Sequence, residues 1–302
     1  MALSPKVSFI TVNYNGFRHT ENLLRTIFDN DFSFDFEVIV LDNGSRFNEF
    51  AQLLAHYPLI KGCYLHENLG FAGGNNRGLE LATGDYLFFI NNDTLLPYKS
   101  ENQIQAMISF CESKPQVGGL SPKILYAEPE NLIQFAGSTL LSPITLRNKQ
   151  LGYREYDQGQ YDQIHPIPYF HGAAMFVPKK VVDIVGGLPT CYFLYYEEID
   201  WSCTITKQFD LYYFPGAKIY HLESASTGLD SPFKTFYLTR NRLLFAYRQR
   251  KDLVRLCAIC YLVFFAFPLN MCRFFIKLKF KHCWAMIRGL FSGFRWIVGL
   301  NR

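Results

Sequence analysis

Carboxylate and imidazole side chains occur at predicted strand ends or turns at four places: Asp42, Asp93, the cluster Glu197, Glu198 and Asp200, and His221. Singly, each has a structural explanation, because aspartate suits turns and helix caps and a histidine can end a strand. Together they suit metal-dependent chemistry. Carboxylates bind Mg²⁺ or Mn²⁺, imidazole is a further ligand for Mn²⁺, and a separate carboxylate can accept a proton from an attacking hydroxyl group.

The stretch that best localises this chemistry is an apolar run, Tyr86–Ile90, followed directly by Asn91, Asn92 and Asp93. Such a run is typical of a buried strand in a parallel sheet. Ligands of open α/β sheets bind beyond the carboxyl ends of the strands. The three polar residues are therefore predicted to lie where a ligand or a metal ion binds.

A second candidate segment is the glycine-rich stretch 68–76, which precedes a predicted helix. Backbone N–H groups and the helix dipole can bind phosphate at such a turn. The stretch is neither a Walker loop nor a GxGxxG motif, so alone it indicates little.

The elements that must position these residues alternate between strand and helix over the first 90 residues. Strands are expected at 7–13, 37–41, 62–66 and 86–90, with helices at about 19–28, after a cap at Ser45, and up to about 82. This order predicts a Rossmann-like, mostly parallel α/β sheet with helices on both faces.

The second half is more irregular. Helices are expected at 104–111, from 179 to a glycine end at 186, and from 197 towards 207; extended segments are expected at 117–126, 169–177, 211–214 and 217–221. A polar, loop-rich stretch covers 138–167, and long irregular segments in compact domains are often binding loops or lids. It is the expected place for a second substrate.

Charge divides the chain into two parts. Residues 1–231 carry 16 Lys and Arg against 25 Asp and Glu, whereas 232–302 carry 14 against Asp252 alone, together with 16 aromatic residues. The apolar run 256–269 has 14 residues, fewer than the roughly 20 that cross a bilayer. With the basic helix expected at 237–250 and the cations spaced along 273–296, it indicates an interfacial or re-entrant segment. A basic bundle on the catalytic part is the alternative, and nucleic-acid binding is disfavoured.

The cysteines and the N-terminus concern the compartment. Eight cysteines are scattered, and the one close pair, Cys257 and Cys260, lies in the apolar run, which argues against zinc or redox chemistry. The first residues lead into a strand without a signal-peptide pattern. A reducing, cytoplasmic compartment is expected.

Seven motifs in order give a resemblance to a known family: VSFITVNYNG at 7–16, VLDNGS at 40–45, NLGFAGGNN at 68–76, NNDT at 91–94, HGAAMFV at 171–177, YEEIDW at 196–201 and IYH at 219–221. The chain resembles family 2 of the glycosyltransferases, most closely its rhamnosyltransferase-like branch, over residues 6 to about 250. The resemblance implies a GT-A fold.

The resemblance also implies binding roles. The donor nucleotide-sugar would contact Thr11, Asn13, Asp42, Asn68, Gly70, Gly74, Asn75, Asn91 and Asn92. Asp93 matches the last residue of the family's DxD motif and would bind Mg²⁺ or Mn²⁺ with His221, while Asn91 replaces the first carboxylate of that motif. On the acceptor side stand Gly172, Ala173 and Trp201.

Glu198 matches the family's general base, with Glu197 or Asp200 as the alternatives if the register shifts. The implied mechanism is inverting, with the base taking the proton of an acceptor hydroxyl group. Two departures are visible: Ile205 stands where many relatives carry arginine, and the Gln-x-x-Arg-Trp motif of processive synthases does not follow the base, which implies one sugar added per encounter.

These inferences predict a metal-dependent glycosyltransferase that moves a sugar, such as rhamnose, from a nucleotide-diphosphate donor to a saccharide or lipid-linked saccharide for cell-surface polysaccharide. The catalytic domain would span 1–231, with a donor half to about 98 and an acceptor half from 99, and 232–302 would hold it on the anionic inner face of the cell membrane. The alternatives are a catalytically silent binding scaffold of the same fold and, less well matched after the first strand, a nucleotidyltransferase.

Overall fold

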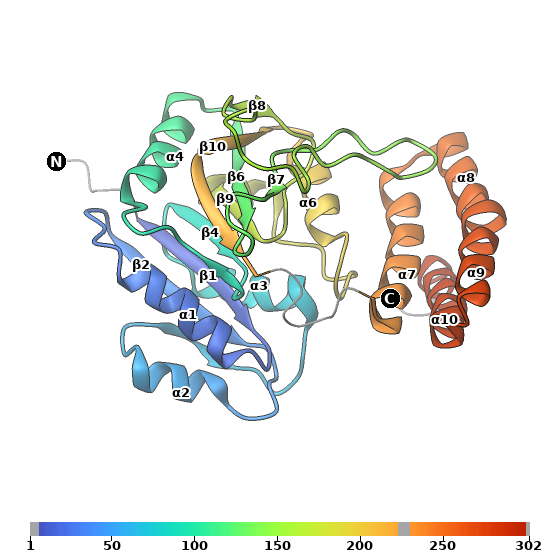
Figure 1. Cartoon of the computed structure of the whole chain (residues 1–302), viewed down its shortest axis with the longest axis horizontal. Coiled ribbons are helices and arrows are strands. Elements are labelled where there is room, and N and C mark those ends of the chain that lie inside the picture. The colour runs from blue at the N-terminus through green and yellow to red at the C-terminus, as the bar shows by residue number, and fades with distance from the viewer. Residues whose placement is uncertain (1–5, 223–229, 300–302) are drawn as a thin grey trace.

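The computed structural model describes residues 6–222 and 230–299, and a ten-stranded mixed sheet forms its centre (Figure 1). The strand order is β3-β2-β1-β4-β9-β6-β10-β5, with β7 beside β6 and β8 beside β10. The strands are β1 Val7–Asn13, β2 Phe36–Asp42, β3 Lys61–Tyr64, β4 Tyr86–Ile90, β5 Thr94–Leu95, β6 Val117–Tyr126, β7 Ile133–Phe135, β8 His165–Pro166, β9 Ala174–Pro178 and β10 Asp210–His221.

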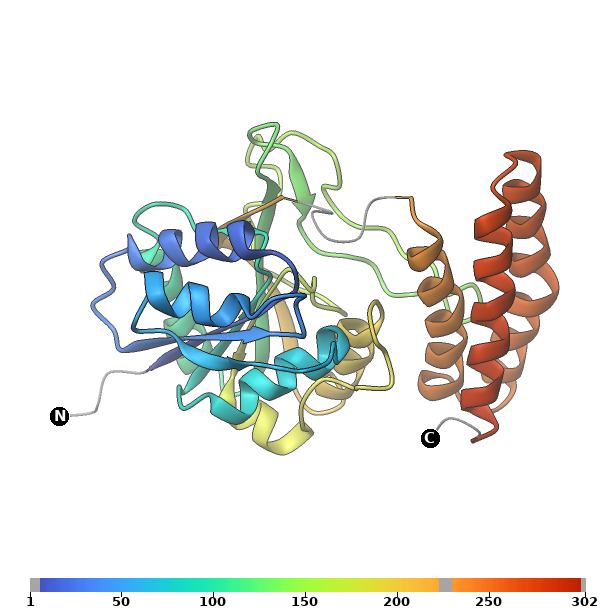
Figure 2. The ribbon, with the colours of Figure 1, turned by 90° about the horizontal axis from the view of Figure 1, so that it is seen from below.

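The N-terminal half is the parallel part of the sheet. β1 pairs in parallel with β2 and β4, and β2 with β3. Helices α1 (Phe17–Phe28) and α2 (Glu49–His56) lie on one face of the sheet and α3 (Gly70–Leu81) on the other (Figure 2). All five residues of β4 are buried, which explains their continuous apolar character. The predicted α/β alternation is confirmed here.

The predicted cap of α2 is wrong by one turn. Asn48, not Ser45, caps the helix, accepting from the Ala51 N–H at 2.9 Å. Ser45 stays in the preceding turn, because its hydroxyl group accepts the Asn15 N–H and its own N–H donates to Asp42 Oδ1.

The C-terminal half of the sheet is mixed. β9 pairs antiparallel with β4 and β6, whereas β10 pairs in parallel with β6. β10 is one strand rather than the two predicted, with a register shift between Phe214 and Lys218. β9 begins at Ala174 because the preceding segment closes a turn, in which the Ala174 N–H donates to His171 O. The helices of this half are α4 Glu101–Ser113, α5 Lys179–Val185 and α6 Glu197–Ile205.

The C-terminal region forms a helical bundle beside the sheet domain, with its long helices side by side in both views (Figures 1 and 2). Its elements are α7 Pro232–Gln249, α8 Asp252–Tyr261, the π-helical turn η1 Leu262–Ala266, α9 Phe267–Ile276 and α10 Phe280–Ile297. α8, η1 and α9 are one continuous helix of 25 residues with a mean hydropathy of 1.9 over its most apolar window. It is thus longer than the predicted apolar run, and its length and composition are those of a helix that could cross a membrane.

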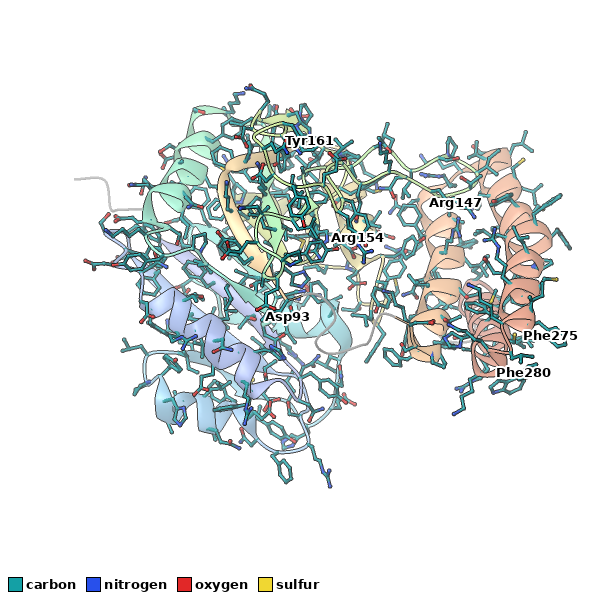
Figure 3. All side chains as sticks on the ribbon, in the orientation of Figure 1. Asp93, Arg147, Arg154, Tyr161, Phe275 and Phe280 are labelled. Carbon is teal, nitrogen blue, oxygen red and sulfur yellow. The ribbon has the colours of Figure 1, made fainter. Side chains whose placement is uncertain are left out.

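A second hydrophobic cluster joins this bundle to the sheet domain. It contains Leu243 and Phe245 of α7, Leu262 of η1, and Leu141 and Tyr169 from the segment between β7 and β9. The loop around residue 147 extends from the sheet domain to the bundle, as the position of Arg147 shows (Figure 3).

A buried lysine fixes the other end of that loop-rich segment. Lys123 of β6 is fully buried, and its Nζ donates to Asp157 at 2.8 Å and to Asp162 at 2.5 Å. Because a buried cation without partners is strongly unfavourable, these two aspartates are required and they hold the segment against the sheet.

Candidate active site

Asp93 and His221 meet because two short strands pair. Antiparallel pairing of β5 with β10 places Thr94 opposite His221, and the Leu222 N–H donates to Asp93 O at 2.8 Å. This pairing brings the two side chains together: His221 Nε2 lies 3.1 Å from Asp93 Oδ1, and both residues are buried. The predicted metal pair, 128 residues apart in sequence, thus lies together.

The second nitrogen of His221 is also engaged. Nδ1 lies 2.7 Å from Gln134 Oε1 of β7. With the amide oxygen as acceptor, Nδ1 carries the hydrogen, and in the neutral imidazole Nε2 would then have a lone pair for a metal ion, as in histidines that bind metal ions. The 3.1 Å contact is itself an ion pair when Nε2 is protonated, and imidazole nitrogen and carboxylate oxygen are also the ligand types that Mn²⁺ accepts.

Among the described residues, Asp93 and His221 would supply only part of a coordination shell. Within residues 6–222 and 230–299 no group of three His, Cys, Asp or Glu side chains could hold a metal ion. Mg²⁺ and Mn²⁺ sites in nucleotide-binding enzymes commonly use one or two protein ligands and complete the shell with phosphate oxygens and water.

Asp93 opens onto a cavity of about 420 Å³ at the carboxyl ends of β1 and β4; Figure 3 shows Asp93 in the middle of the sheet domain. Six of the predicted donor-side and metal residues line it: Asn68, Gly70, Asn75, Asn91, Asn92 and Asp93. Aromatic walls come from Tyr14, Phe71, Phe193 and Phe233, which are suited to stacking on a planar ring.

Gly70 is required by the shape of this cavity. Its φ is +73°, and a Cβ atom there would lie 2.2 Å from Phe193 O. The approach allows the Phe71 N–H to donate to Phe193 O at 2.8 Å. Asn68 Oδ1 accepts the Gly70 N–H at 2.8 Å and thereby holds the start of α3.

Four predicted donor residues do not line the cavity. Asp42 is fully buried, with Oδ2 accepting the N–H groups of Glu49 and Phe50 at the start of α2. Asn13 is committed to Thr20 and Glu49. Thr11 is buried, and Gly74 packs α3 against β1, where a Cβ atom would lie 2.8 Å from Val12 Cγ1. Direct donor contacts by these four stay predictions.

A second cavity, of about 280 Å³, adjoins the first. The two share Phe71, Asn91 and Leu194 as wall residues, so Asn91 stands at their boundary. Gly172, Ala173, Glu197 and Glu198 line the second cavity. A Cβ atom on Gly172 would touch Glu198 Cγ at 3.7 Å, which places this turn directly against the glutamate.

The two glutamates begin α6 in an unusual environment. Tyr195 and Tyr196 before them have φ values of 70° and 79°, uncommon for bulky residues and typical of functional sites. Burial raises the pKa of Glu198 to about 7, although N–H groups of residues 198 and 199 partly oppose this. Burial and the neighbouring Glu198 hold the pKa of Glu197 well above its usual range. Glu198 therefore has a pKa suited to a general base at neutral pH.

The other two predicted residues of this helix lie elsewhere. Asp200 is fully buried and accepts from Tyr192, Arg248 and Gln249 at 2.8–2.9 Å. Trp201 is in the core, donating to Gly186 O, with its ring edge-on to Phe89. Their helical positions turn both side chains away from the cavity, so the structure corrects their placement in the site.

The structure adds residues that the sequence did not single out. Gln134 orients His221, and Asn43 bonds to Asn68 and to Gly70 O in the donor cavity wall. His171 has its ring centre 6.2 Å from that of His221, and burial lowers its pKa to about 3, so it is neutral. The motif at 171–177 contained a signal for His171, whereas nothing local marked Gln134.

A family comparison agrees with this geometry. The profile described as "Glycosyl transferase family 2" matches residues 8–176, more than half of the chain and including β4, Asp93 and the Gly172 turn. The chain belongs to glycosyltransferase family 2. It is accordingly a glycosyltransferase, and the predicted family is confirmed.

Two relatives illustrate the range of this family. The chain is 26% identical over 204 residues to the low-salt glycan biosynthesis hexosyltransferase Agl10 of Haloferax volcanii, covering 65% of the chain and 60% of the relative. It is 25% identical over 217 residues to an N-acetylglucosaminyl-diphospho-decaprenol L-rhamnosyltransferase of Mycobacterium tuberculosis, covering 64% and 68%. The chain thus spans about two thirds or less of either relative.

Among solved structures, the chain is similar to the mannosyltransferase PcManGT of Pyrobaculum calidifontis in complex with GDP-Man and Mn²⁺. The TM-score is 0.55 at 16% sequence identity, covering 99% of this chain and 77% of the other. At this identity the likeness shows the fold alone. The family 2 chain therefore has the predicted GT-A fold.

Proposed function

We propose that this family 2 enzyme transfers a hexose from a nucleotide-diphosphate sugar to a lipid-linked saccharide, in a metal-dependent, inverting reaction. The observation that carries the proposal is the common wall of the two cavities, with Asp93, which contacts His221, lining one cavity and Glu198 lining the other. Donor and acceptor bound in them would meet at Asn91.

The donor cavity supports binding of a nucleotide diphosphate. Asp93 and His221 would hold Mg²⁺ or Mn²⁺, which would neutralise charge on the leaving diphosphate. Phe193 and Phe233 offer stacking surfaces, and the amides of Asn68 and Asn75 offer hydrogen bonds for hydroxyl groups.

The acceptor cavity supports proton removal by Glu198. As a carboxylate it would take the proton of an acceptor hydroxyl group while the oxygen attacks the anomeric carbon and the diphosphate leaves from the opposite face. The negative charge of Glu198 raises the pKa of Glu197, since one carboxylate of a close pair binds a proton more tightly, so Glu197 would hold a proton while Glu198 acts as the carboxylate. Catalysis by a single base in direct attack inverts the anomeric configuration.

The lipid-linked class of acceptor, and rhamnose as one donor sugar, are supported by the mycobacterial relative's name and by the basic bundle. We propose that α7–α10 hold the enzyme on the cytoplasmic face of the membrane. Each Lys or Arg near an anionic surface contributes about 1 kcal/mol.

A panel of nucleotide-diphosphate sugars, each with and without Mn²⁺, tests the proposal. We expect at least one donor to be hydrolysed slowly with Mn²⁺ and to stabilise the protein against heat. Stabilisation without any hydrolysis or transfer would favour the silent scaffold instead, and no response to any donor would contradict both.

A further inference from the structure

A third cavity, of about 280 Å³, lies inside the helical bundle. Its walls come from α7, η1, α9 and α10, and most of the lining is apolar, including Leu243, Leu262, Ala266, Phe267 and Met286. The volume is close to the lower end of the range for ligand-binding cavities, about 300 Å³. Neither the donor nor the acceptor sugar as proposed above would use it.

Arg242 brings a positive charge into this apolar lining. Its Nη2 donates to Thr145 O, whereas its Nε is buried without a hydrogen-bond partner within the described residues. It takes part in none of the ion pairs formed within 6–222 and 230–299. A phosphate group would supply both the acceptor and the counter-charge, because guanidinium pairs with phosphate in a planar fork.

The bundle cavity and the acceptor cavity are lined by consecutive residues of the chain. Tyr195 lines the acceptor cavity, and the next residue, Tyr196, lines the bundle cavity. Asn148, three residues after Thr145, also lines the acceptor cavity. The charges of Arg242 and Glu198 both act on the Tyr196 phenol, whose pKa burial raises to about 12. Tyr196 therefore lies between the charges of Glu198 and Arg242.

The wall formed by η1 has an irregularity of its own. The Phe267 N–H bonds to Leu262 O, five residues earlier, and Pro268 follows without an N–H group to continue the α-helical pattern. π-helical turns are frequent at functional sites. Leu262 and Ala266 face the cavity from this turn, while Phe264 and Phe265 are 68% and 67% exposed. The same turn thus joins the cavity to an apolar outer surface.

We propose that the bundle cavity binds the isoprenoid phosphate portion of the lipid-linked acceptor, with Arg242 on the phosphate and the first part of the chain between η1 and α7. This proposal rests on the proposed function and names where its acceptor is recognised. The remaining chain would run along the exposed apolar surface of η1 into the membrane.

Photo-crosslinking of the full chain with a diazirine derivative of farnesyl diphosphate tests this site, with Mn²⁺ and a nucleoside diphosphate present to occupy the donor cavity. Mass spectrometry should map the label to α7, η1 and α9. Arg242→Gln should lower labelling about tenfold, the effect of losing one charge-assisted contact. Ala266→Trp should lower labelling by a similar factor, about tenfold, because the indole would fill the cavity. Arg273→Gln and Leu269→Trp, at exposed positions of α9, should label like the wild type.

Competition identifies the ligand. Unlabelled farnesyl diphosphate should suppress labelling, and phosphatidylglycerol vesicles should not. Equal suppression by the vesicles would assign the site to membrane phospholipid, and undiminished labelling of Arg242→Gln would remove the phosphate contact; either overturns the proposal. If Ala266→Trp does not fold, the labelling of Arg242→Gln, a substitution at a partly exposed position, still tests the proposal.

Donor hydrolysis by the wild-type protein separates this proposal from the transferase function. Hydrolysis without labelling of the bundle would reject the isoprenoid site alone. Labelling of the bundle without hydrolysis or transfer of any donor would leave a lipid-binding site and reject the proposed function.

Discussion

Glu197 and Glu198 differ in what surrounds them, although they are neighbours in sequence. Glu198 lies against the Gly172 turn in the acceptor cavity, while Glu197 is buried with its Oε2 unpaired within the described part of the chain. The raised pKa of both carboxyls has burial as its main cause. Coupled carboxylates titrate as a pair, so their pH dependence belongs to both.

Glu198→Gln should retain donor binding and lower the rate of transfer about 10²- to 10⁴-fold, because the amide cannot accept the proton. In the wild type, transfer should fall as pH decreases through about 7, since the base is then protonated. Initial rates between pH 5.5 and 8.5 measure this. If Glu197→Gln lost all transfer activity while Glu198→Gln stayed active, the base would be Glu197.

The same substitution should stabilise the protein at high pH. A carboxyl whose folded-state pKa is raised contributes stability below its unfolded pKa, near 4.5, and loses it as pH rises through about 7. Glu198→Gln should therefore raise the unfolding free energy at pH 8 by about 1–3 kcal/mol, allowing for partial solvent access. Urea unfolding at pH 8 and pH 5 measures this difference in free energy. Stabilisation of the variant at pH 5 but not at pH 8 would be inconsistent with the raised pKa.

Residue type alone could not separate Glu198 from Asp200. Both were candidate bases from the sequence, but the position of each on α6 decides which side chain faces the cavity, and that depends on packing against α7. Trp201 was misplaced for the same reason. Asp42, by contrast, was expected in the turn after a strand and is the last residue of β2, where its Oδ2 accepts N–H groups from the start of α2.

At the scale of elements, Asp200 ties helix α6, which carries Glu198, to α7. Its carboxylate accepts from Arg248 and Gln249 of α7 and from Tyr192. The pair raises the pKa of Arg248, mainly through the hydrogen bond to Asp200. The acid that the sequence offered as an alternative base thus anchors the helix that presents Glu198.

Asp200→Asn should lower the free energy of unfolding by about 2 kcal/mol, because Arg248, which is partly exposed, loses its counter-charge. Transfer per folded molecule should change little. As a control, Asp183→Asn removes an exposed i,i+4 ion pair on α5. Its free energy of unfolding should stay within about 0.5 kcal/mol of the wild-type value. Chemical denaturation and specific activity of the folded fraction measure both effects, and an inactive but fully stable Asp200→Asn would return Asp200 to the catalytic residues.

Local patterns located the buried strands of the parallel half and missed the two-residue strand β5. β1, β2 and β4 are buried apolar runs, so composition alone located them to within a residue or so. β5 has two residues and no such pattern, yet its pairing with β10 brings Asp93 to His221. The family motifs, rather than periodicity, linked these two residues in advance.

At the scale of the whole molecule, the charge division of the sequence corresponds to two bodies of structure. The basic bundle lies beside the acidic sheet domain, and its outer surface carries large exposed apolar side chains, among them Phe275 and Phe280 at the end of the bundle remote from Arg147 (Figure 3). The length of the α8–η1–α9 helix could not be read from the apolar run, because Asp252 and Arg255 at one end and Arg273 at the other interrupt it.

The double variant Phe275→Asp with Phe280→Asp should weaken binding to phosphatidylglycerol vesicles at least tenfold, because two apolar contacts are lost and two repulsive charges added. Phe47→Asp, equally exposed on the sheet domain, should bind like the wild type. Vesicle sedimentation at fixed ionic strength measures this. Unchanged binding of the double variant would contradict membrane attachment through this end of the bundle.

The central claim is that Asp93 and His221 form one side of a metal-dependent donor site, and calorimetric titration of nucleoside diphosphates with and without Mn²⁺ tests it most directly. The account predicts Mn²⁺-dependent binding of at least one nucleoside diphosphate, weakened at least tenfold in Asp93→Asn and in His221→Gln but retained in Asp183→Asn. Equal, Mn²⁺-dependent affinity in Asp93→Asn and the wild type would contradict it.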